Sequence, residues 1–274
     1  MTHSFPKYKI LDQDFFKQID TEQKAYILGL LWADGHNDPK KTGGTVSITI
    51  CEPDDKLLYI IKDIFYGDVN RPIYTYDRKK LNPRWKNVSV LSICSKIISH
   101  DLLKLGMKSN KTYDISIPNC IPDKLLSHFV RGMFDGDGHF TTTTDGDCTF
   151  GITCNIILLH QIQEIFSTKL KLKKTKLNIT NNPKIGRLRY GGIKNAYKIY
   201  NYLYNGCNIC MERKLSKFVK YFADNISRVL KTKTSKYERV CFNKNRNNWV
   251  AKNKTGIQKR FPSEYDAYLF TLTS

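Results

Sequence analysis

Apolar and polar positions follow each other along the chain in a pattern that predicts the same order of elements twice. The first half predicts an apolar helix between Thr21 and Gly35, a strand over 44–50, a helix over 54–67, strands over 71–77 and 85–94, and a helix over 95–106. The second half predicts a helix from Pro122, strands over 138–144 and 148–154, a helix over 155–170, strands over 173–180 and 186–192, and a helix over 194–205. Two such units fit one pseudo-symmetric α+β domain.

Each half contains a related motif at the end of its first helix. The stretches "ILGLLWADG", residues 27–35, and "VRGMFDGDG", residues 130–138, align without a gap. Small residues lie four apart in each motif and therefore share one helix face, which lets two backbones approach closely. Parallel packing of the two helices would place Asp34 and Asp137 side by side at the negative helix ends. A divalent cation makes that arrangement favourable, and carboxylate, carbonyl and water ligands suit Mg²⁺.

The motifs also have simpler interpretations than a metal site. Gly35 and Gly138 could merely end the helices, with the aspartates as polar turn residues. The duplication of the same spacing favours the metal site over that reading. A calcium loop starting at "DGDGHF" is excluded, because Phe140 stands where the required glycine would be and Gly146 where the glutamate would be.

The charge balance points to a polyanionic partner. The 274 residues include 45 lysines and arginines against 25 acidic residues, a formal net charge of +20. Such an excess is typical of proteins that bind nucleic acid. No apolar run approaches the roughly 18–20 residues that span a bilayer, and the N-terminal residues lack a signal-peptide core. We therefore expect a soluble intracellular protein, cytoplasmic in a bacterial or viral setting, with no membrane partner.

The eight cysteines are scattered and mostly lie in apolar stretches, which favours reduced, buried thiols. Cys207 and Cys210 form a CxxC pair that could be half of a zinc site. The sequence offers no second CxxC or HxxxH pair to complete it, so zinc is the less favoured reading.

The two motifs resemble those of the LAGLIDADG homing endonucleases in their single-chain, two-motif form. The spacing of about a hundred residues between motifs, the order of elements and the stretch "YLYNGCNICMERK" support the resemblance, which covers residues 20–222. It implies two αββαββα repeats that form a DNA-binding saddle of antiparallel sheets around a two-helix interface. The expected domains are residues 1–112, residues 113–225, a basic linker at 226–236 and a C-terminal module at 237–274.

The resemblance also implies an activity, a cofactor and the residues of the site. The family hydrolyses phosphodiester bonds in both strands of double-stranded DNA with Mg²⁺, for which Mn²⁺ can substitute, and the single-chain form acts as a monomer. The metal ligands and catalytic acids map onto Asp34 and Asp137, with the carbonyl groups of Ala33 and Gly136 completing the shell. Basic residues that assist cleavage map onto Lys96 and, with a less certain alignment, Lys194.

Basic residues on the predicted strands and their loops are expected to contact DNA phosphates. They are Arg78, Lys79, Lys80, Arg84, Lys86, Lys184, Arg187 and Arg189. Each of them taken alone could equally be a solvated surface charge. The strand "TVSITI" alternates apolar and polar residues, which leaves one sheet face free to line a groove.

The tail after residue 236 predicts three short strands and a helix opened by Ser263, and it resembles an AP2-type DNA-binding fold. The resemblance implies a small ββα-type module in which Tyr265, Ala267 and Tyr268 pack the helix against the sheet. Its expected DNA-binding residues are Arg239, Lys244, Arg246, Trp249 and Lys252. Trp249 could instead be the core of so small a module, and the tail could order only on DNA.

Two other functions fit the same fold and charge. An RNA-splicing maturase would share both, and a transcription regulator would keep DNA binding without cleavage. The presence of both motif aspartates argues against the regulator and leaves the maturase open. An intein-embedded enzyme is disfavoured, because the chain lacks the terminal residues that protein splicing uses.

Overall fold

The computed structural model describes residues 8–41, 43–67, 70–109, 115–230, 235, 237–243 and 245–273. Contacts within the chain divide it into two compact units, residues 1–221 and residues 222–274.

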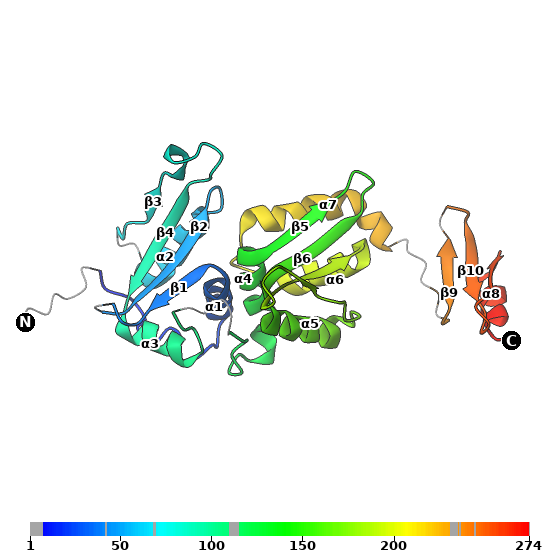
Figure 1. The fold of residues 1–274 in the computed structure, drawn as a ribbon, viewed down its shortest axis with the longest axis horizontal. Helices are drawn as coiled ribbons and strands as arrows, with labels where there is room; N and C mark the ends of the chain where they lie inside the picture. The colour runs from blue at the N-terminus through cyan, green and yellow to red at the C-terminus, as the bar shows by residue number, and fades with distance from the viewer. Residues whose placement is uncertain are drawn as a thin grey trace, which may run out of the picture. The chain divides into compact units, whose positions relative to one another are not determined.

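The first repeat of unit 1 has the predicted elements in the predicted order, with one further strand, β1, directly after the first helix. It consists of α1 (Glu22–Asp34), β1 (Gly35–Asp38), β2 (Thr45–Cys51), α2 (Lys56–Tyr66), β3 (Tyr74–Tyr76), a 3₁₀ turn (Arg78–Lys80), β4 (Val88–Cys94) and α3 (Lys96–Lys104). The four strands form an antiparallel sheet in the order β1-β2-β4-β3. Figure 1 shows this sheet in blue and cyan.

The second repeat has the same topology, which confirms the predicted α+β duplication. Its elements are a 3₁₀ turn (Asp123–Leu125), α4 (Leu126–Asp137), β5 (Gly138–Thr142), β6 (Cys148–Asn155), α5 (Ile156–Leu170), β7 (Asn178–Ile179), β8 (Ile185–Gly191) and α6 (Ile193–Tyr204). The antiparallel order β5-β6-β8-β7 matches that of the first sheet (Figure 1). A long helix, α7 (Glu212–Leu230), follows.

Two elements differ from their predicted bounds. The strand expected over 173–180 is only two residues long, because the side chain of Gln163 on α5 binds the main-chain carbonyl of Thr175 (2.7 Å) that a ladder would need. Helix α7 begins at Glu212, whereas the stretch "KFVKYFADNISRVLKTKTSK" predicts a helix only from Lys217. The Met211 amide directly before α7 binds Asp135 on α4.

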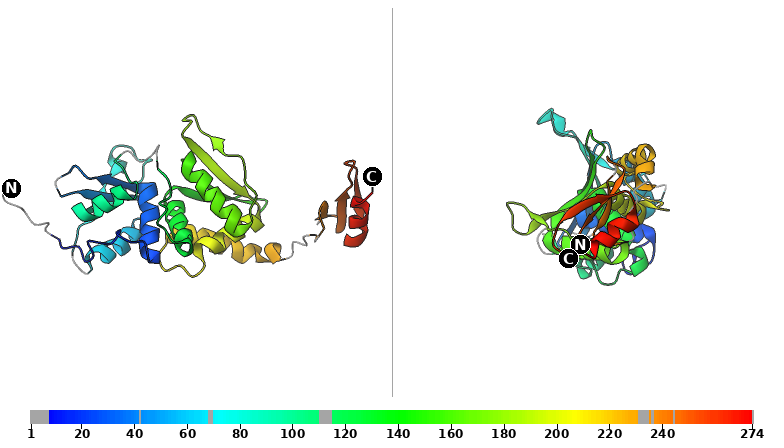
Figure 2. Two further views of the ribbon diagram at one scale, coloured as in Figure 1. Left: turned by 90° about the horizontal axis from the view of Figure 1, so that it is seen from below. Right: turned by 90° about the vertical axis from the view of Figure 1, so that its right-hand side faces the viewer.

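Each large sheet keeps one face free of helices, as the alternation predicts. Val46 and Ile48 on β2 are fully buried, whereas Thr49 between Ile48 and Ile50 is exposed. The buried residues point toward the helices: α2 and α3 pack on the first sheet, and α5 and α6 on the second. Figure 2 shows these helices beneath their sheets. The open faces are thus available for a partner.

Helices α1 and α4 pack against each other with their backbones in contact, which confirms the predicted role of the small residues. A β-carbon added at Gly29 would lie 2.0 Å from the carbonyl oxygen of Phe129, and one at Gly132 would lie 2.1 Å from that of Tyr26. No side chain fits at such distances, so only glycine allows this approach.

Unit 2 contains a three-stranded antiparallel sheet in the order β11-β10-β9 and one helix. The elements are β9 (Val240–Asn243), β10 (Asn248–Lys252), β11 (Gln258–Phe261) and α8 (Glu264–Thr271), where Ser263 caps α8 through the amide of Asp266. The side chains of Trp249, Ala251 and Ala267 form its core.

Two expectations for unit 2 need correction. Trp249 is only 8% exposed and packs against Phe242, so it is part of the core and does not present its ring to DNA. The reason is that its strand has just one helix-covered face, and Trp249 lies on it. Tyr265 is 58% exposed and does not pack the helix on the sheet; Phe270, partly buried against the core, does.

The cysteines are free, but most are not buried as expected. Only Cys148 and Cys154 are buried, and Cys51, Cys120 and Cys241 are exposed. Cys51 ends β2 on the face opposite Ile50, so strand alternation turns it outward. Within the described residues, no helix is long and apolar enough to cross a membrane.

Candidate functional site

The two motif aspartates are the last residues of α1 and α4, at adjacent helix ends. Asp34 and Asp137 are both half-buried. A β-carbon at Gly136 would lie 2.8 Å from Oδ2 of Asp34 and 2.3 Å from the β-carbon of Ala33. The carboxylate of the first motif therefore lies directly against the backbone of the second.

Lys214, near the start of α7, lies buried at the C-terminal end of α4. Its ammonium group donates to the carbonyl oxygens of Phe134 (2.7 Å), Asp135 (2.6 Å), Gly136 (3.2 Å) and Gly138 (2.7 Å). A cation here offsets the negative end of the helix dipole and pairs carbonyls that the helix leaves unsatisfied.

The electrostatics of Lys214 tie it to the motif aspartates. Burial lowers the pKa of Lys214 to about 8, and the negative charges of Asp135, Asp34 and Asp137 oppose that shift. The lysine is thus close enough to both motif carboxylates to feel their charge. Sequence reasoning missed it, because its only signal was its place in "YLYNGCNICMERK" and nothing in that stretch reveals which helix end it reaches.

His139, directly after the second motif, is a further residue that sequence reasoning did not assign. Its ring lies across Gly151 on β6, where a β-carbon would come within 2.4 Å of Cε1 and Nε2. The pKa of His139 is lowered, first by burial and then by the positive charges of Arg189, Lys214 and Arg187. Two of the predicted DNA-binding arginines therefore lie around this ring beside the end of α4.

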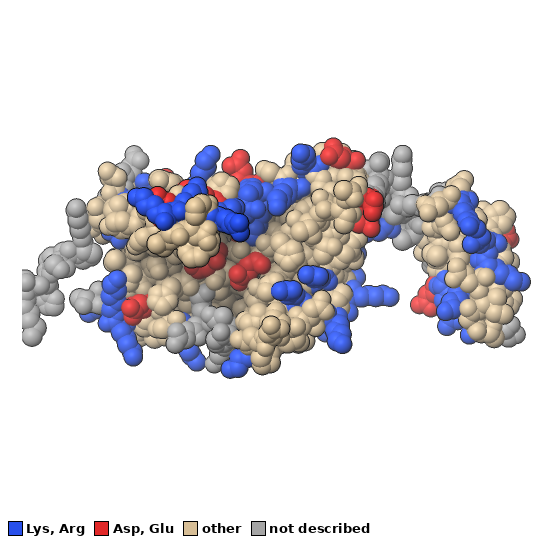
Figure 3. Space-filling model, turned by 45° about the horizontal axis from the view of Figure 1, so that its top comes forward, with Lys and Arg blue, Asp and Glu red and all other residues tan. Residues whose placement is uncertain are grey.

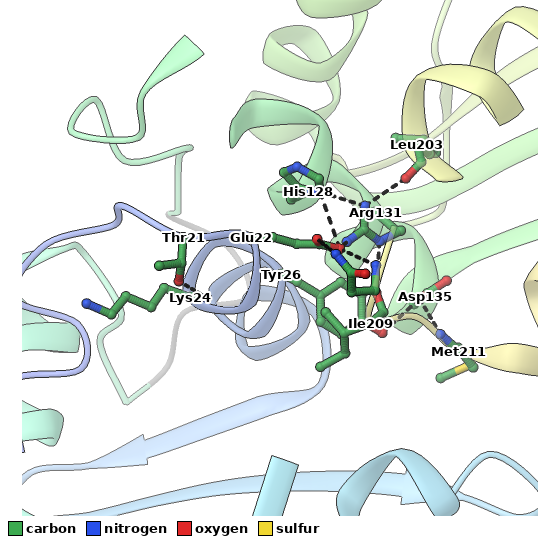
Figure 4. A network of polar contacts seen from close by, with 11 residues as sticks. Thr21, Glu22, Lys24, Tyr26, His128, Arg131, Asp135, Leu203, Ile209 and Met211 are labelled. Atoms are coloured by element: carbon green, nitrogen blue, oxygen red, sulfur yellow. Dashed lines mark hydrogen bonds and ion pairs between the residues drawn. The ribbon is translucent and has the colours of Figure 1, made fainter. Parts of the chain in front are cut away.

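A buried ion pair joins the two repeats behind the aspartates. Arg131 on α4 is fully buried and donates to Glu22 on α1 (2.7 Å). Its remaining donors reach the carbonyl oxygens of Leu203 (2.8 Å) and Ile209 (3.0 Å), and it contacts His128 (Figure 4). A buried guanidinium needs this full set of partners, because an unpaired buried charge is costly.

Asp135 occupies the sixth motif position and belongs to the same network, which explains why the apolar run contains a carboxylate. It is fully buried and accepts hydrogen bonds from the hydroxyls of Tyr26 (2.8 Å) and Tyr204 (2.5 Å) and the amide of Met211 (2.7 Å). Burial raises the pKa of Asp135 despite these donors. Its partners come from α1, α6 and the segment before α7, so Asp135 is a structural anchor (Figure 4).

The two lysines predicted to assist cleavage, Lys96 and Lys194, lie at the starts of helices. They do not lie at the strand positions where the chain enters each sheet after its motif aspartate. Lys96 is exposed at the start of α3, two residues after Cys94, which pairs with Thr45 on β2. Gly35, which follows Asp34, pairs with Ile48 on the same strand. Those ladder positions are three residues, about 10 Å, apart. Lys194 is half-buried near the start of α6, after the end of β8. Their roles in cleavage stay predictions.

The predicted phosphate-binding residues of unit 1 are exposed on strands and loops. In the first repeat they are Arg78, Lys79, Lys80, Arg84 and Lys86, all between β3 and β4; in the second they are Lys184, Arg187 and Arg189. Lys79 pairs with Glu52 (3.0 Å), and the guanidinium of Arg78 lies 4.8 Å from the ring centre of Trp85, itself 45% exposed. Figure 3 shows lysine and arginine side chains gathered over this side of the molecule.

In unit 2, Arg239, Arg246 and Lys252 are exposed. Lys244, also expected to bind DNA, lies outside the described residues.

The donor groups present suit a metal that takes few protein ligands. Within the described part of the chain, no three or more His, Cys, Asp or Glu side chains cluster as a metal site, and this includes the CxxC pair considered for zinc. The Asp34 carboxylate lies beside Gly136, in space that a β-carbon at that residue would fill. The Gly136 carbonyl oxygen has two lone pairs, and Lys214 uses one of them. Two carboxylates and nearby carbonyls fit Mg²⁺, which completes its shell with water and phosphate oxygens.

Comparison with known proteins identifies the fold. No family model matches the chain, and no curated protein matches it. A crystal structure of the meganuclease I-SmaMI bound to uncleavable DNA matches with a TM-score of 0.51 and 15% identity, covering 76% of this chain and 91% of that one. The same protein with its uncleaved target and calcium ions matches with a TM-score of 0.50 and 14% identity, covering 76% and 92%.

The chain has the fold of the LAGLIDADG homing endonucleases. The LAGLIDADG endonuclease I-LtrWI bound to its target DNA also matches, with a TM-score of 0.49 and 14% identity over 81% of this chain and 93% of that one. The comparisons do not support the AP2-type resemblance of the C-terminal segment.

Proposed function

We propose that the protein is a site-specific endonuclease that hydrolyses one phosphodiester bond in each strand of double-stranded DNA. The observation that supports the proposal is the approach of the Asp34 carboxylate to the backbone of Gly136, the residue before Asp137. Two carboxylates at adjacent helix ends can hold a divalent cation, which in turn can bind a phosphate oxygen.

Mg²⁺, with Mn²⁺ as a substitute, is the proposed cofactor. Asp34 and Asp137 would hold it, with carbonyl oxygens of Ala33 and Gly136. When bound, the ion activates water and screens the charge that develops on the phosphate.

The remaining site residues would act on the substrate and on the carboxylates. Lys214 holds the end of α4, and with it Asp137, in place through four hydrogen bonds. His139, whose lowered pKa keeps it neutral at pH 7, can accept a hydrogen bond from water or donate one to a phosphate oxygen. Arg187 and Arg189 are exposed beside it and would fix the backbone of one strand.

The partner would be a long DNA site that both sheets contact. Exposed basic residues on the loop between β3 and β4 and on β8 suit phosphates on either side of the cleavage position. Unit 2 would add sequence-independent affinity through Arg239, Arg246 and Lys252. One chain supplies both motifs, so we propose that a monomer is active.

A cleavage assay on a randomised duplex library tests the function. The full chain is incubated with Mg²⁺, and the ends of the products are sequenced. The proposal predicts enrichment of one sequence with cuts in both strands at fixed positions. A maturase or a non-cleaving regulator would retain DNA or RNA without producing new ends, and that outcome would refute the proposal.

A further inference from the structure

The segment between α6 and α7, residues 205–211, acts as a clasp on the two motif helices. Its hydrogen bonds run from the amide and side chain of Asn208 to Glu22 on α1 (2.8 and 2.7 Å), from Arg131 on α4 to the Ile209 carbonyl (3.0 Å), and from the Met211 amide to Asp135 on α4 (2.7 Å). Any change within the clasp therefore reaches both helices.

Two cysteines lie within the clasp, on either side of these contacts. Cys207 and Cys210 flank Asn208 and Ile209, at which the backbone bends. Gly206, directly before Cys207, has a φ of +67°. The two thiols are close enough for each to influence the ionisation of the other. Both residues are half-buried, which leaves them open to solutes.

Solvent reaches Cys210 through an open hollow of about 280 Å³. The hollow is lined on one side by Asp54 and Ile60 of the first repeat and on the other by Glu212 and Arg213 of α7. Arg213 holds it together through a bidentate ion pair with Asp54. Cys210 therefore faces solvent in this hollow, and Cys207, which does not line it, is itself only half-buried.

The two thiols differ in acidity, as an attacking and a resolving thiol do. The hydrogen bond from Cys210 and the positive charge of Arg131 lower the pKa of Cys207 to about 7, against the effect of burial. The pKa of Cys210 is raised by the same hydrogen bond and by burial. Cys207 is thus substantially ionised at neutral pH, and the thiolate is the nucleophile in disulfide exchange.

We propose that Cys207 and Cys210 are a reversible dithiol–disulfide site, oxidised by a low-molecular-weight disulfide such as glutathione disulfide. The Cys207 thiolate attacks one sulfur of that disulfide, whose S–S bond breaks and releases one glutathione thiolate. Cys210 then loses its proton and attacks the Cys207 sulfur of the mixed disulfide, which releases the second glutathione. The two cysteines lose two electrons and two protons, and two glutathione thiols are formed.

This site places a redox-sensitive bond inside the segment that joins the two motif helices. The proposal is independent of nuclease activity, because it depends only on the clasp and its thiols.

The proposal is tested on the folded full chain. The protein is equilibrated in buffers of reduced and oxidised glutathione, free thiols are blocked with N-ethylmaleimide, and tryptic peptides are analysed by mass spectrometry. Cleavage after Lys198 and Arg213 yields a peptide, residues 199–213, that contains both cysteines and no others. Peptides with the exposed Cys51 and Cys241 serve as internal controls.

We expect residues 199–213 to lose both blocking groups and carry an internal disulfide as oxidised glutathione increases, and to regain both with dithiothreitol. The Cys210→Ser variant should instead stop at a glutathione adduct on Cys207, because the resolving thiol is gone. The proposal is wrong if the wild-type peptide stays doubly blocked while Cys51 and Cys241 carry glutathione. It is also wrong if the wild-type peptide accumulates a glutathione adduct as Cys210→Ser does.

Discussion

Oδ2 of Asp34 lies only 2.8 Å from the point at which Gly136 would carry a β-carbon. The two repeats thus meet at the proposed catalytic carboxylate itself. Gly136→Ala should displace Asp34 and Ala33 and greatly reduce DNA cleavage. The Asp34 carboxylate can rotate away, but the β-carbon of Ala33 is fixed to the backbone, so the last turn of α1 must shift. Because this turn is at the end of the helix, the free energy of unfolding should fall by about 1–3 kcal/mol. Urea unfolding and a cleavage assay on the same sample measure both effects.

Gly132→Ala provides the contrast. Its added β-carbon would meet the carbonyl oxygen of Tyr26 at 2.1 Å, and a backbone cannot move aside as a side chain can. We expect a larger loss of stability than for Gly136→Ala, above about 3 kcal/mol. Equal stability losses in the two variants would contradict the helix contact described above.

Removal of the Lys214 ammonium group should destabilise the end of α4. Lys214→Met removes this donor from the buried carbonyl of Asp135, at a cost of about 1–3 kcal/mol, whereas the carbonyl of Phe134 keeps its bond from the Gly138 amide. Urea unfolding of both proteins at about pH 7 measures the difference, with the exposed Lys217→Met as a control. A variant as stable as the wild type would show that these hydrogen bonds contribute nothing.

The pKa of Lys214 also gives a pH dependence with a definite sign. The pKa is about 8 in the folded protein against 10.5 for an ordinary lysine, so between these values the unfolded chain binds one more proton. The contribution of Lys214 to the free energy of unfolding therefore rises as pH increases from about 8 to about 10.5. From pH 8 to about 10.5, the free energy of unfolding should therefore change more favourably with rising pH in the wild type than in Lys214→Met. A steeper slope for the variant would contradict the lowered pKa.

His139 should titrate below the ordinary histidine value of 6.5, because burial and three nearby cations disfavour its charged form. Replacement of one cation, as in Arg189→Gln, should move the pKa of His139 upward. Proton NMR of the imidazole Cε1–H resonance measures both midpoints. An unchanged midpoint would show that Arg189 does not lie beside the ring.

Two glycine substitutions test whether the position of His139 matters for cleavage. Gly151→Ala would push the ring away, since its β-carbon would lie 2.4 Å from Nε2, whereas Gly191→Ala on β8 meets nothing within 4 Å. We expect Gly151→Ala to slow cleavage of one strand about as much as His139→Ala does, and Gly191→Ala to leave the rate unchanged.

The ion pair between Glu22 and Arg131 should couple the two repeats. Arg131→Met leaves the carbonyls of Leu203 and Ile209 without this donor and should cost about 1–3 kcal/mol for each of them. The half-buried Glu22 carboxylate keeps its hydrogen bonds from Asn208. Glu22→Gln keeps part of the hydrogen bonding and should cost less. A double-mutant cycle should give a coupling energy of about 0.5–3 kcal/mol. Additive losses would mean that the pair is not a unit.

The sequence predicted the repeated order of elements because apolar periodicity and glycine spacing are local signals. Gly29 and Gly132 pointed to the helix contact for the same reason, since small residues four apart share one face. Val46, Ile48 and Ile50 likewise indicated which side of β2 is buried.

The parts that could not be predicted depend on contacts between distant segments. Lys214 reaches α4 only because α7 folds back across the second repeat, and Arg131 finds Glu22 at a separation of 109 residues. Trp249 was ambiguous in sequence, because a tryptophan on a short strand can face either the core or a ligand. Only the packing of α8 decides between these roles.

We propose that Asp34 and Asp137 each direct the cleavage of one DNA strand. The most direct measurement is the rate of strand nicking, on the duplex selected by the wild type, by Asp34→Asn, Asp137→Asn and the double variant. The account predicts that each single variant nicks one strand, that the two nick opposite strands, and that the double variant leaves the duplex intact. Cleavage of both strands by the double variant at the wild-type rate would contradict it.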